Sequence, residues 1–160
     1  MKNWILFAAL LGAMACRKEA DVPAGTALIG EWRYVGTFSH AADYGCMPCP
    51  GYDYDKAPTL NLDASGKLSG KSVVNQYEGT YRAMVEDSTR QIFQRGTFQI
   101  SMLFQTEIAG TPAQMQEESH YVDRLQKTTS YYVDTNGTLY VSLSLSQAKS
   151  SDYLFFVRRK

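Results

Sequence analysis

Short segments in which apolar and polar residues alternate make up most of this chain. In ALIGEWRYVG, for example, Trp32 falls on one face of an extended strand and Glu31 falls on the other. Turn sequences separate such segments, among them DASG at residues 63–66 and the pair Asn136-Gly137, which suits a tight hairpin turn. This pattern predicts antiparallel sheet, because each strand has one face for a core and a partner one turn away.

The period of the pattern changes once, after residue 110. Thr111 precedes Pro112, and Gln114 follows Thr111 by three residues, which is a capping-box sequence with proline at the first helical position. We therefore predict a helix from Pro112 to about Leu125. The residues expected to line its buried face are Met115, Tyr121, Val122 and Leu125.

The remaining segments complete the expected fold. Residues 36–58 have no period and are rich in Gly, Pro and Asp, so we expect a long surface loop there. Strands and hairpins are expected at residues 27–36, 59–73, 77–96, 97–104, 130–145 and 152–159. The prediction is one α+β, β-rich domain, an antiparallel sheet or partly open barrel of about eight strands with one helix.

The N-terminus has the parts of an export signal. Lys2 is followed by an apolar run from Trp4 to Leu11, and small residues follow that run. The run is shorter than the roughly 20 residues that a helix needs to cross a bilayer. We therefore expect a cleaved signal peptide at residues 1–15.

The sequence GAMAC at residues 12–16 resembles the bacterial lipobox. The resemblance implies that Cys16 receives a diacylglycerol and becomes the mature N-terminus, with the bilayer as partner through its acyl chains. The alternative is a plain signal peptide with a chance cysteine. Residues 16–26 then form a lipidated tether ahead of a domain at residues 27–160, and Arg17 after the cysteine favours the outer membrane of the cell envelope.

Charge argues against nucleic acid as a partner. The chain has 16 Lys and Arg residues, 15 once Lys2 is removed with the signal peptide, against 16 Asp and Glu residues. No run of basic residues occurs, so no surface for a phosphate backbone is expected. We expect a monomer.

The sharpest candidate site is GCMPCPGY, which contains Cys46 and Cys49. Such a pair can be a redox centre, half of a zinc site or a local disulfide. The prolines leave no helix to activate a thiolate, and a structural zinc site needs four ligands, so we expect a disulfide. The aromatic residues around the pair can form a binding loop or pack over the end of the sheet; they are Tyr44, Tyr52 and Tyr54.

No metal, cofactor or catalytic constellation stands out. Glu117-x-x-His120 has the spacing of half a di-iron site, but a second copy and two more acids are missing. Neither a Gly-x-Ser-x-Gly motif nor a Gly-rich phosphate loop is present. We therefore expect no enzymatic activity.

Several motifs together resemble the META domain, also called HslJ-like. LIGEWRYVG carries Gly30 and Trp32, and GKSVVNQYEGTYRA carries Asn75, Tyr77, Gly79 and Tyr81 at the places of the family motif. One departure is that the cysteine usual before the Asn is Val74 here. The resemblance implies an envelope lipoprotein without an established enzymatic activity.

The motif residues have a structural interpretation. Gly79 between two tyrosines suits a kink or bulge that lets a bulky neighbour approach. Asn75 is expected to bond backbone groups at the start of its strand.

The sequence thus favours a non-enzymatic envelope lipoprotein with a protein-interaction or envelope-stress role. One alternative is a lipocalin-like carrier of a small apolar ligand, because Gly30-x-Trp32 with Arg158 resembles the lipocalin signature, in which an arginine covers the tryptophan at the closed end of the barrel. Another is an inhibitor of an extracellular enzyme, presented by the loop at residues 37–57.

Overall fold

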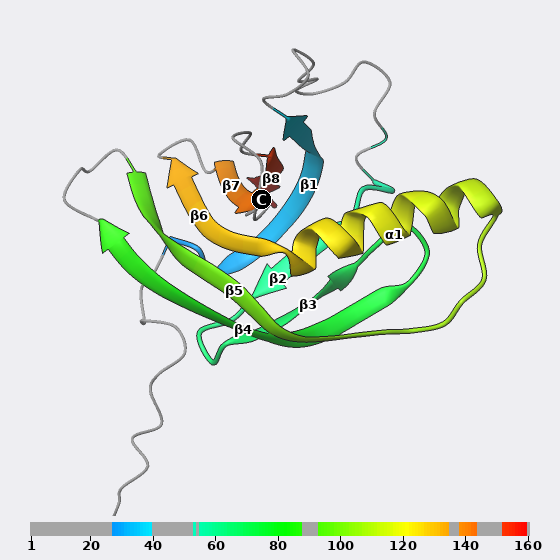
Figure 1. Ribbon diagram of the computed structural model, residues 1–160, viewed down its shortest axis with the longest axis horizontal. Coiled ribbons are helices and arrows are strands. Elements are labelled where there is room, and N and C mark those ends of the chain that lie inside the picture. Colours follow the sequence, from blue (N-terminus) through cyan, green and yellow to red (C-terminus); the bar gives the residue numbers. More distant parts are fainter. Residues whose placement is uncertain are drawn as a thin grey trace, which may run out of the picture.

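A computed structural model describes residues 27–39, 53, 55–87, 93–134, 138–143 and 152–159. The described residues form one antiparallel barrel in which each strand pairs with its neighbours in sequence, and β1 closes the ring against β8 (Figure 1). The predicted β-rich fold is confirmed, with a closed ring. Its strands are β1 (Gly30–Ser39), β2 (Thr59–Leu62), β3 (Lys67–Lys71), β4 (Gln76–Asp87), β5 (Phe93–Gln105), β6 (Thr128–Asp134), β7 (Thr138–Leu143) and β8 (Asp152–Arg158).

Two strands are longer than the sequence predicted. β1 continues to Ser39, into the segment expected to be loop, because its second half pairs with β8. β5 is one strand of 13 residues where two were expected, and it pairs along most of its length with β4. The predicted turn at Asn136-Gly137 lies outside the described residues, as do residues 88–92.

Large side chains fill the barrel interior. Trp32, Tyr81, Phe98 and Phe156 are at most 1 % exposed and belong to one core cluster. The rings of Tyr81 and Phe98 are 5.3 Å apart, in a tilted arrangement that aromatic pairs favour. The alternation read from the sequence therefore does place one face of each strand inside the barrel.

The helix α1 (Pro112–Gln126) lies between β5 and β6, and its capping box is confirmed, since Thr111 and Gln114 exchange hydrogen bonds. Its buried face differs from the prediction at two positions. Met115 is 39 % exposed, whereas Glu118 is buried. The first turns of α1 extend beyond the strands, so a side chain there has no core to enter (Figure 1).

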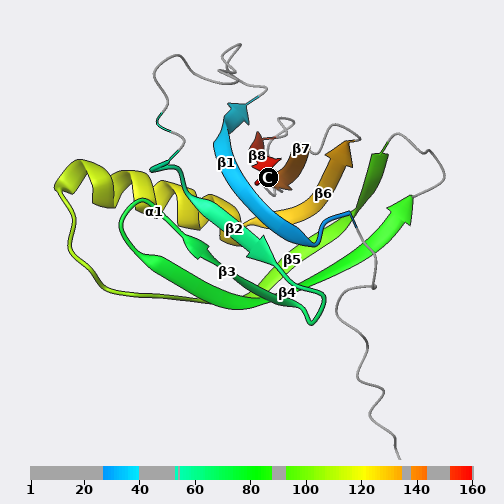
Figure 2. The same cartoon turned by 180° about the vertical axis from the view of Figure 1, so that it is seen from behind.

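The two ends of the barrel are closed by different elements. At one end β1 begins and β8 finishes, and Trp32 lies there; we call it the tryptophan end. At the other end β5 finishes and β6 begins, and α1, which connects them, lies across it; we call it the helix end. Figure 2 shows α1 from behind, beside the ends of β2, β3 and β4.

Candidate functional site

A buried carboxylate at the helix end is the most densely bonded polar group among the described residues. Glu118 of α1 is 2 % exposed. Its Oε2 accepts hydrogen bonds from Ser72 Oγ at 2.6 Å, Val74 N at 2.7 Å and Asn75 N at 2.8 Å. Its Oε1 accepts from Asn75 Nδ2 at 2.6 Å and from Gln105 Nε2. We call Glu118, Ser72, Asn75 and Gln105 the carboxylate cluster.

Asn75 connects this cluster to the chain that leads into the helix. Its Oδ1 accepts from Ile108 N at 2.6 Å and from Thr106 Oγ1 at 2.8 Å, and its Nδ2 also donates to Ile108 O at 3.1 Å. Asn75 therefore bonds backbone groups, as predicted from the sequence. One amide thereby joins the β3–β4 turn, the β5–α1 connection and α1.

The surroundings of Glu118 favour its charged form. Burial raises the pKa of this carboxyl, but the hydrogen bonds from Ser72, Asn75 and Val74 outweigh burial, so the pKa lies below its ordinary value. A carboxylate offers about four lone-pair sites, and five donors already occupy it. A hollow of about 450 Å³ opens beside it, but the carboxylate at its floor has no free site for a metal or a substrate proton.

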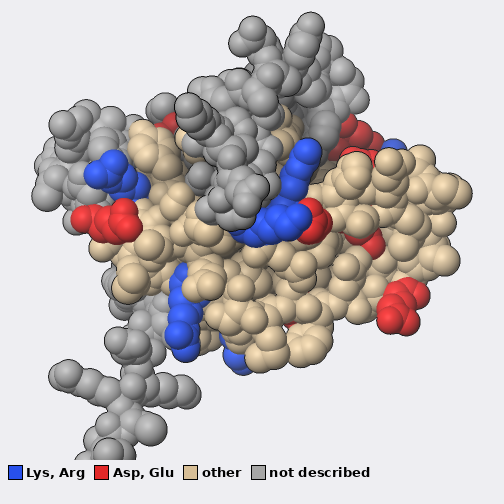
Figure 3. Space-filling model, in the orientation of Figure 1, with Lys and Arg blue, Asp and Glu red and all other residues tan. Residues whose placement is uncertain are grey.

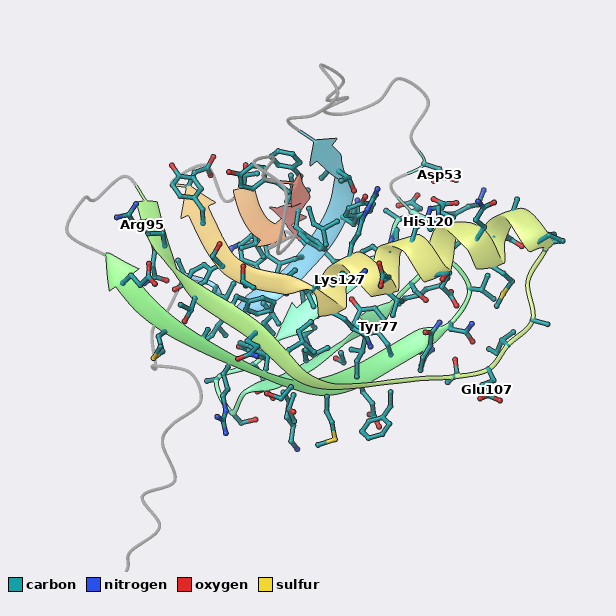
Figure 4. The ribbon with its side chains drawn as sticks, in the orientation of Figure 1. Asp53, Tyr77, Arg95, Glu107, His120 and Lys127 are labelled. Atoms are coloured by element: carbon teal, nitrogen blue, oxygen red, sulfur yellow. The ribbon has the colours of Figure 1, made fainter. Side chains whose placement is uncertain are left out.

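The two motif tyrosines hold neighbouring elements. Tyr77 donates to Thr59 O at 2.6 Å, and its hydroxyl lies 3.0 Å from that of Tyr121 on α1; Figure 4 shows it pointing from β4 toward the helix. Tyr81 donates to Asp63 O at 2.7 Å, beside the β2–β3 turn. Burial raises the pKa of both hydroxyls, so both stay protonated and act as donors.

Gly79 lies where β4 and β5 approach each other closely. A Cβ at this position would come within 2.0 Å of Met102 O. The pairing of β4 with β5 shifts register between Thr80 and Tyr81, one residue further along. The extra residue of this irregularity is Ser101 on β5, whereas Gly79 itself pairs with Leu103, so glycine at this position allows a close approach of backbone and not the bulky neighbour that was expected.

At the tryptophan end, Trp32 is covered by an arginine. The Arg158 guanidinium lies 4.4 Å from the Trp32 ring centre, and Trp32 Nε1 donates to Leu28 O at 2.8 Å. Arg158 also donates to Ile29 O at 3.1 Å. Gly30 has φ +142°, and a Cβ there would come within 2.6 Å of Arg158 Nη1, so glycine is what lets the arginine lie over the ring.

The outer face of β2 to β5 carries a second candidate. Asn61, Ser69, Glu78 and Phe104 lie directly opposite one another in one row across the four strands. Hollows of about 610 and 460 Å³ lie on the two sides of this row, and Ser69, Glu78 and Phe104 line both. We call these hollows together the outer groove. Phe104 and Met102 stand in it 60 % and 52 % exposed.

Charge does not concentrate on the face of the molecule shown in Figure 3. Acidic and basic side chains lie among neutral ones there, with no single-sign patch. Within the described ranges, no three His, Cys, Asp or Glu side chains are grouped so that they could hold a metal. Glu117 and His120 are exposed on α1, and Figure 4 shows His120 on the side of the helix away from β4 and β5.

The other predicted site residues lie outside the described residues: Cys16, Tyr44, Cys46, Cys49, Tyr52 and Tyr54. In the part of the chain that the structure describes, no helix has both the length and the apolar character to span a membrane.

Sequence reasoning missed Glu118, Ser72 and Gln105. A signal for Glu118 was present, because it lies three residues before Tyr121 and seven before Leu125, on the buried face of the helix. No local signal marked Ser72 or Gln105, which reach the cluster only through the packing of separate elements.

Two solved structures are similar to this fold. An NMR structure of a protein from Burkholderia xenovorans is 20 % identical, with a TM-score of 0.57 and coverage of 82 % of each chain. A crystal structure of a DUF4847 family protein from Bacteroides vulgatus is 16 % identical, with a TM-score of 0.50 and coverage of 82 % of this chain and 93 % of the other. At these identities the likeness concerns the fold alone.

Family membership follows from the sequence itself. No curated protein matches the chain. The family model of the META domain matches residues 30–160, which contain the barrel, α1, the carboxylate cluster and the Trp32–Arg158 pair. The chain therefore belongs to the META domain family.

Proposed function

We propose that this protein is a lipid-anchored component of the bacterial cell envelope whose META domain acts by binding another macromolecule and performs no catalysis. The lipobox-like sequence ending at Cys16 supports the anchor. The carboxylate cluster supports the absence of catalysis, because its one buried carboxylate is fully used in bonds within the fold.

The observation that carries the binding role is the outer groove. Phe104 lies on β5, is 60 % exposed and lines both hollows. Lys71 and Glu78 line the larger hollow together with it. An exposed aromatic residue with polar neighbours, fixed on a rigid sheet, is typical of the anchors that dominate protein interfaces. The groove therefore offers a preformed surface for a protein segment.

The carrier alternative draws support from the Trp32–Arg158 pair. The space in which a carrier of this size would hold a ligand is, however, occupied by the protein's own side chains, among them Tyr81, Phe98 and Phe156. We therefore prefer binding at the outer surface.

Metabolic labelling with a clickable fatty acid tests the anchor. We expect label on the wild-type chain, found in the membrane fraction, and no label on a Cys16→Ser variant. Unlabelled wild-type protein released in soluble form would overturn the anchored role.

Site-specific photo-crosslinking in intact cells tests the surface. A photoreactive residue in place of Ser69, inside the groove, is expected to give a defined adduct. The matched control replaces Ser119, an exposed serine on α1 that lines neither hollow of the groove, and is expected to give none. Adducts of equal yield from both positions, or from neither, would count against the groove.

A further inference from the structure

One stretch of β5 has a strand on only one side. β6 pairs with β5 from Phe93 to Thr97, but from Phe98 to Gln105 the register joins β5 to β4 alone. Helix α1 lies over the inner face of this stretch, where Gln105 reaches Glu118. In Figure 1 the second half of β5 runs below α1. Along this stretch, the backbone edge away from β4 therefore has no strand partner among the described residues.

This edge lacks the charged residues and proline that commonly protect exposed edges. Strands at the edge of a sheet are commonly shielded by charged residues or proline, because open backbone groups pair with other chains. Residues 97–106, TFQISMLFQT, contain neither. A bulge is another such protection, and the irregular register around Ser101 is one, but it leaves Met102 to Gln105 in regular pairing with β4. Such an edge is suited to pairing with another strand.

We propose that the edge of β5 pairs with the same edge of a second copy of this chain, antiparallel and about a two-fold axis. The uncharged segment meets itself without placing like charges opposite each other in any register. The chain as a whole has 16 basic and 16 acidic residues, so two copies do not repel each other at long range. This replaces the monomer expected from the sequence.

Pairing of this kind has a consequence for the outer face. Met102 and Phe104 of one copy come to lie beside those of the other, because opposed residues in a sheet share a face. The two outer grooves then lie on one continuous sheet. The inference goes beyond the proposed function, and the pairing does not depend on lipid attachment at Cys16.

Sedimentation equilibrium of the full chain in a density-matched detergent measures the association. We expect a monomer–dimer equilibrium that Met102→Lys and Phe104→Lys each weaken by about tenfold, because a lysine on an exposed edge strand opposes pairing with another strand. Met84→Lys is the matched control. Met84 is also an exposed outer-face residue, at 63 %, but it lies on β4 opposite Thr97, in the part of β5 whose other side is paired with β6.

Circular dichroism of each lysine variant establishes that it is folded before its association is compared. A chain that stays monomeric at every concentration would overturn the proposal. So would a dimer that Met84→Lys weakens as strongly as Met102→Lys does.

A cysteine scan locates the axis independently of stability. In a chain whose native cysteines are replaced by serine, single cysteines are placed in turn at each position from Gln99 to Phe104. A two-fold antiparallel pair brings one residue opposite its own copy, with Cβ atoms about 5 Å apart. We expect one position to form a disulfide-linked dimer most readily and Met84→Cys to form none. Uniform crosslinking along the strand would contradict a fixed pairing.

Discussion

The two ends of the barrel are closed by opposite chemistry. At the tryptophan end, the fully buried Trp32 fills the barrel and the Arg158 cation covers its ring at 4.4 Å. At the helix end, the buried anion Glu118 joins α1 to two chain segments through five hydrogen bonds. The first end gains its stability mainly from apolar burial, and the second from charge-assisted hydrogen bonds.

The two ends of the barrel are therefore expected to lose stability in different ways. Apolar burial is lost in proportion to the side chain removed and does not depend on pH. A buried hydrogen-bond network instead fails when its central acceptor is neutralised, because every donor around it is then left partly unsatisfied. Four measurements separate the two behaviours, and the variant that should lose the most stability comes first.

Trp32→Ala is expected to have the largest effect. It removes a fully buried ring and leaves a cavity at the tryptophan end, at a cost of about 3–5 kcal/mol in the free energy of unfolding. Urea unfolding followed by far-UV circular dichroism measures the loss. A smaller loss of unfolding free energy in Trp32→Ala than in Glu118→Gln would show that the tryptophan end contributes less to stability than the helix end.

Glu118→Gln is expected to cost about 2–3 kcal/mol, because an amide places its own donor against the donors of the cluster. Glu117→Gln is the matched control, since Glu117 is the preceding residue and is exposed. Hydrogen exchange should show α1 losing protection first, while the strands at the tryptophan end keep theirs. Equal loss of protection at both ends would show that the ends are not independent.

The pH dependence sharpens the contrast further. The pKa of Glu118 is lower in the folded chain than its ordinary value of 4.5, so its stabilising contribution is complete above that value. The contribution disappears as the pH falls through the folded pKa. The difference in unfolding free energy between wild type and Glu118→Gln should therefore be constant from pH 7 to about pH 5 and shrink below it. A constant difference at all pH values would mean that Glu118 is not charged in the folded chain.

Arg158→Met is expected to have the smallest effect, about 1 kcal/mol, because the guanidinium is largely exposed and its cation–π contact is correspondingly weak. Methionine keeps an apolar cover over Trp32. Thermal unfolding measures the loss, and the pH profile of this variant should match that of wild type. A loss as large as that of Trp32→Ala would mean that the arginine, more than the ring, closes this end.

Much of this structure could be predicted because its signals are local. The alternation around Trp32, the hairpin joining β2 and β3 and the capping box at Thr111 each depend on a few neighbouring residues, and each is present in the structure. One prediction for the helix, the burial of Met115, was wrong. Met115 fits the apolar period of α1, but burial depends on what lies opposite, and the helix begins beyond the strands.

The class of fold, the place of the helix and membership of the META family follow from patterns in the sequence alone. The folded chain was needed to show that Glu118 is a buried anion and that part of β5 has an open edge, whereas the resemblance to the lipocalin signature already implied that Arg158 covers Trp32. The physical reason is the distance along the chain. Period and capping act over a few residues, whereas Ser72 and Asn75 lie 46 and 43 residues before the carboxylate that they bind. A carboxylate meets such donors, and a strand gains or lacks a neighbour, only when the folded chain brings distant segments together.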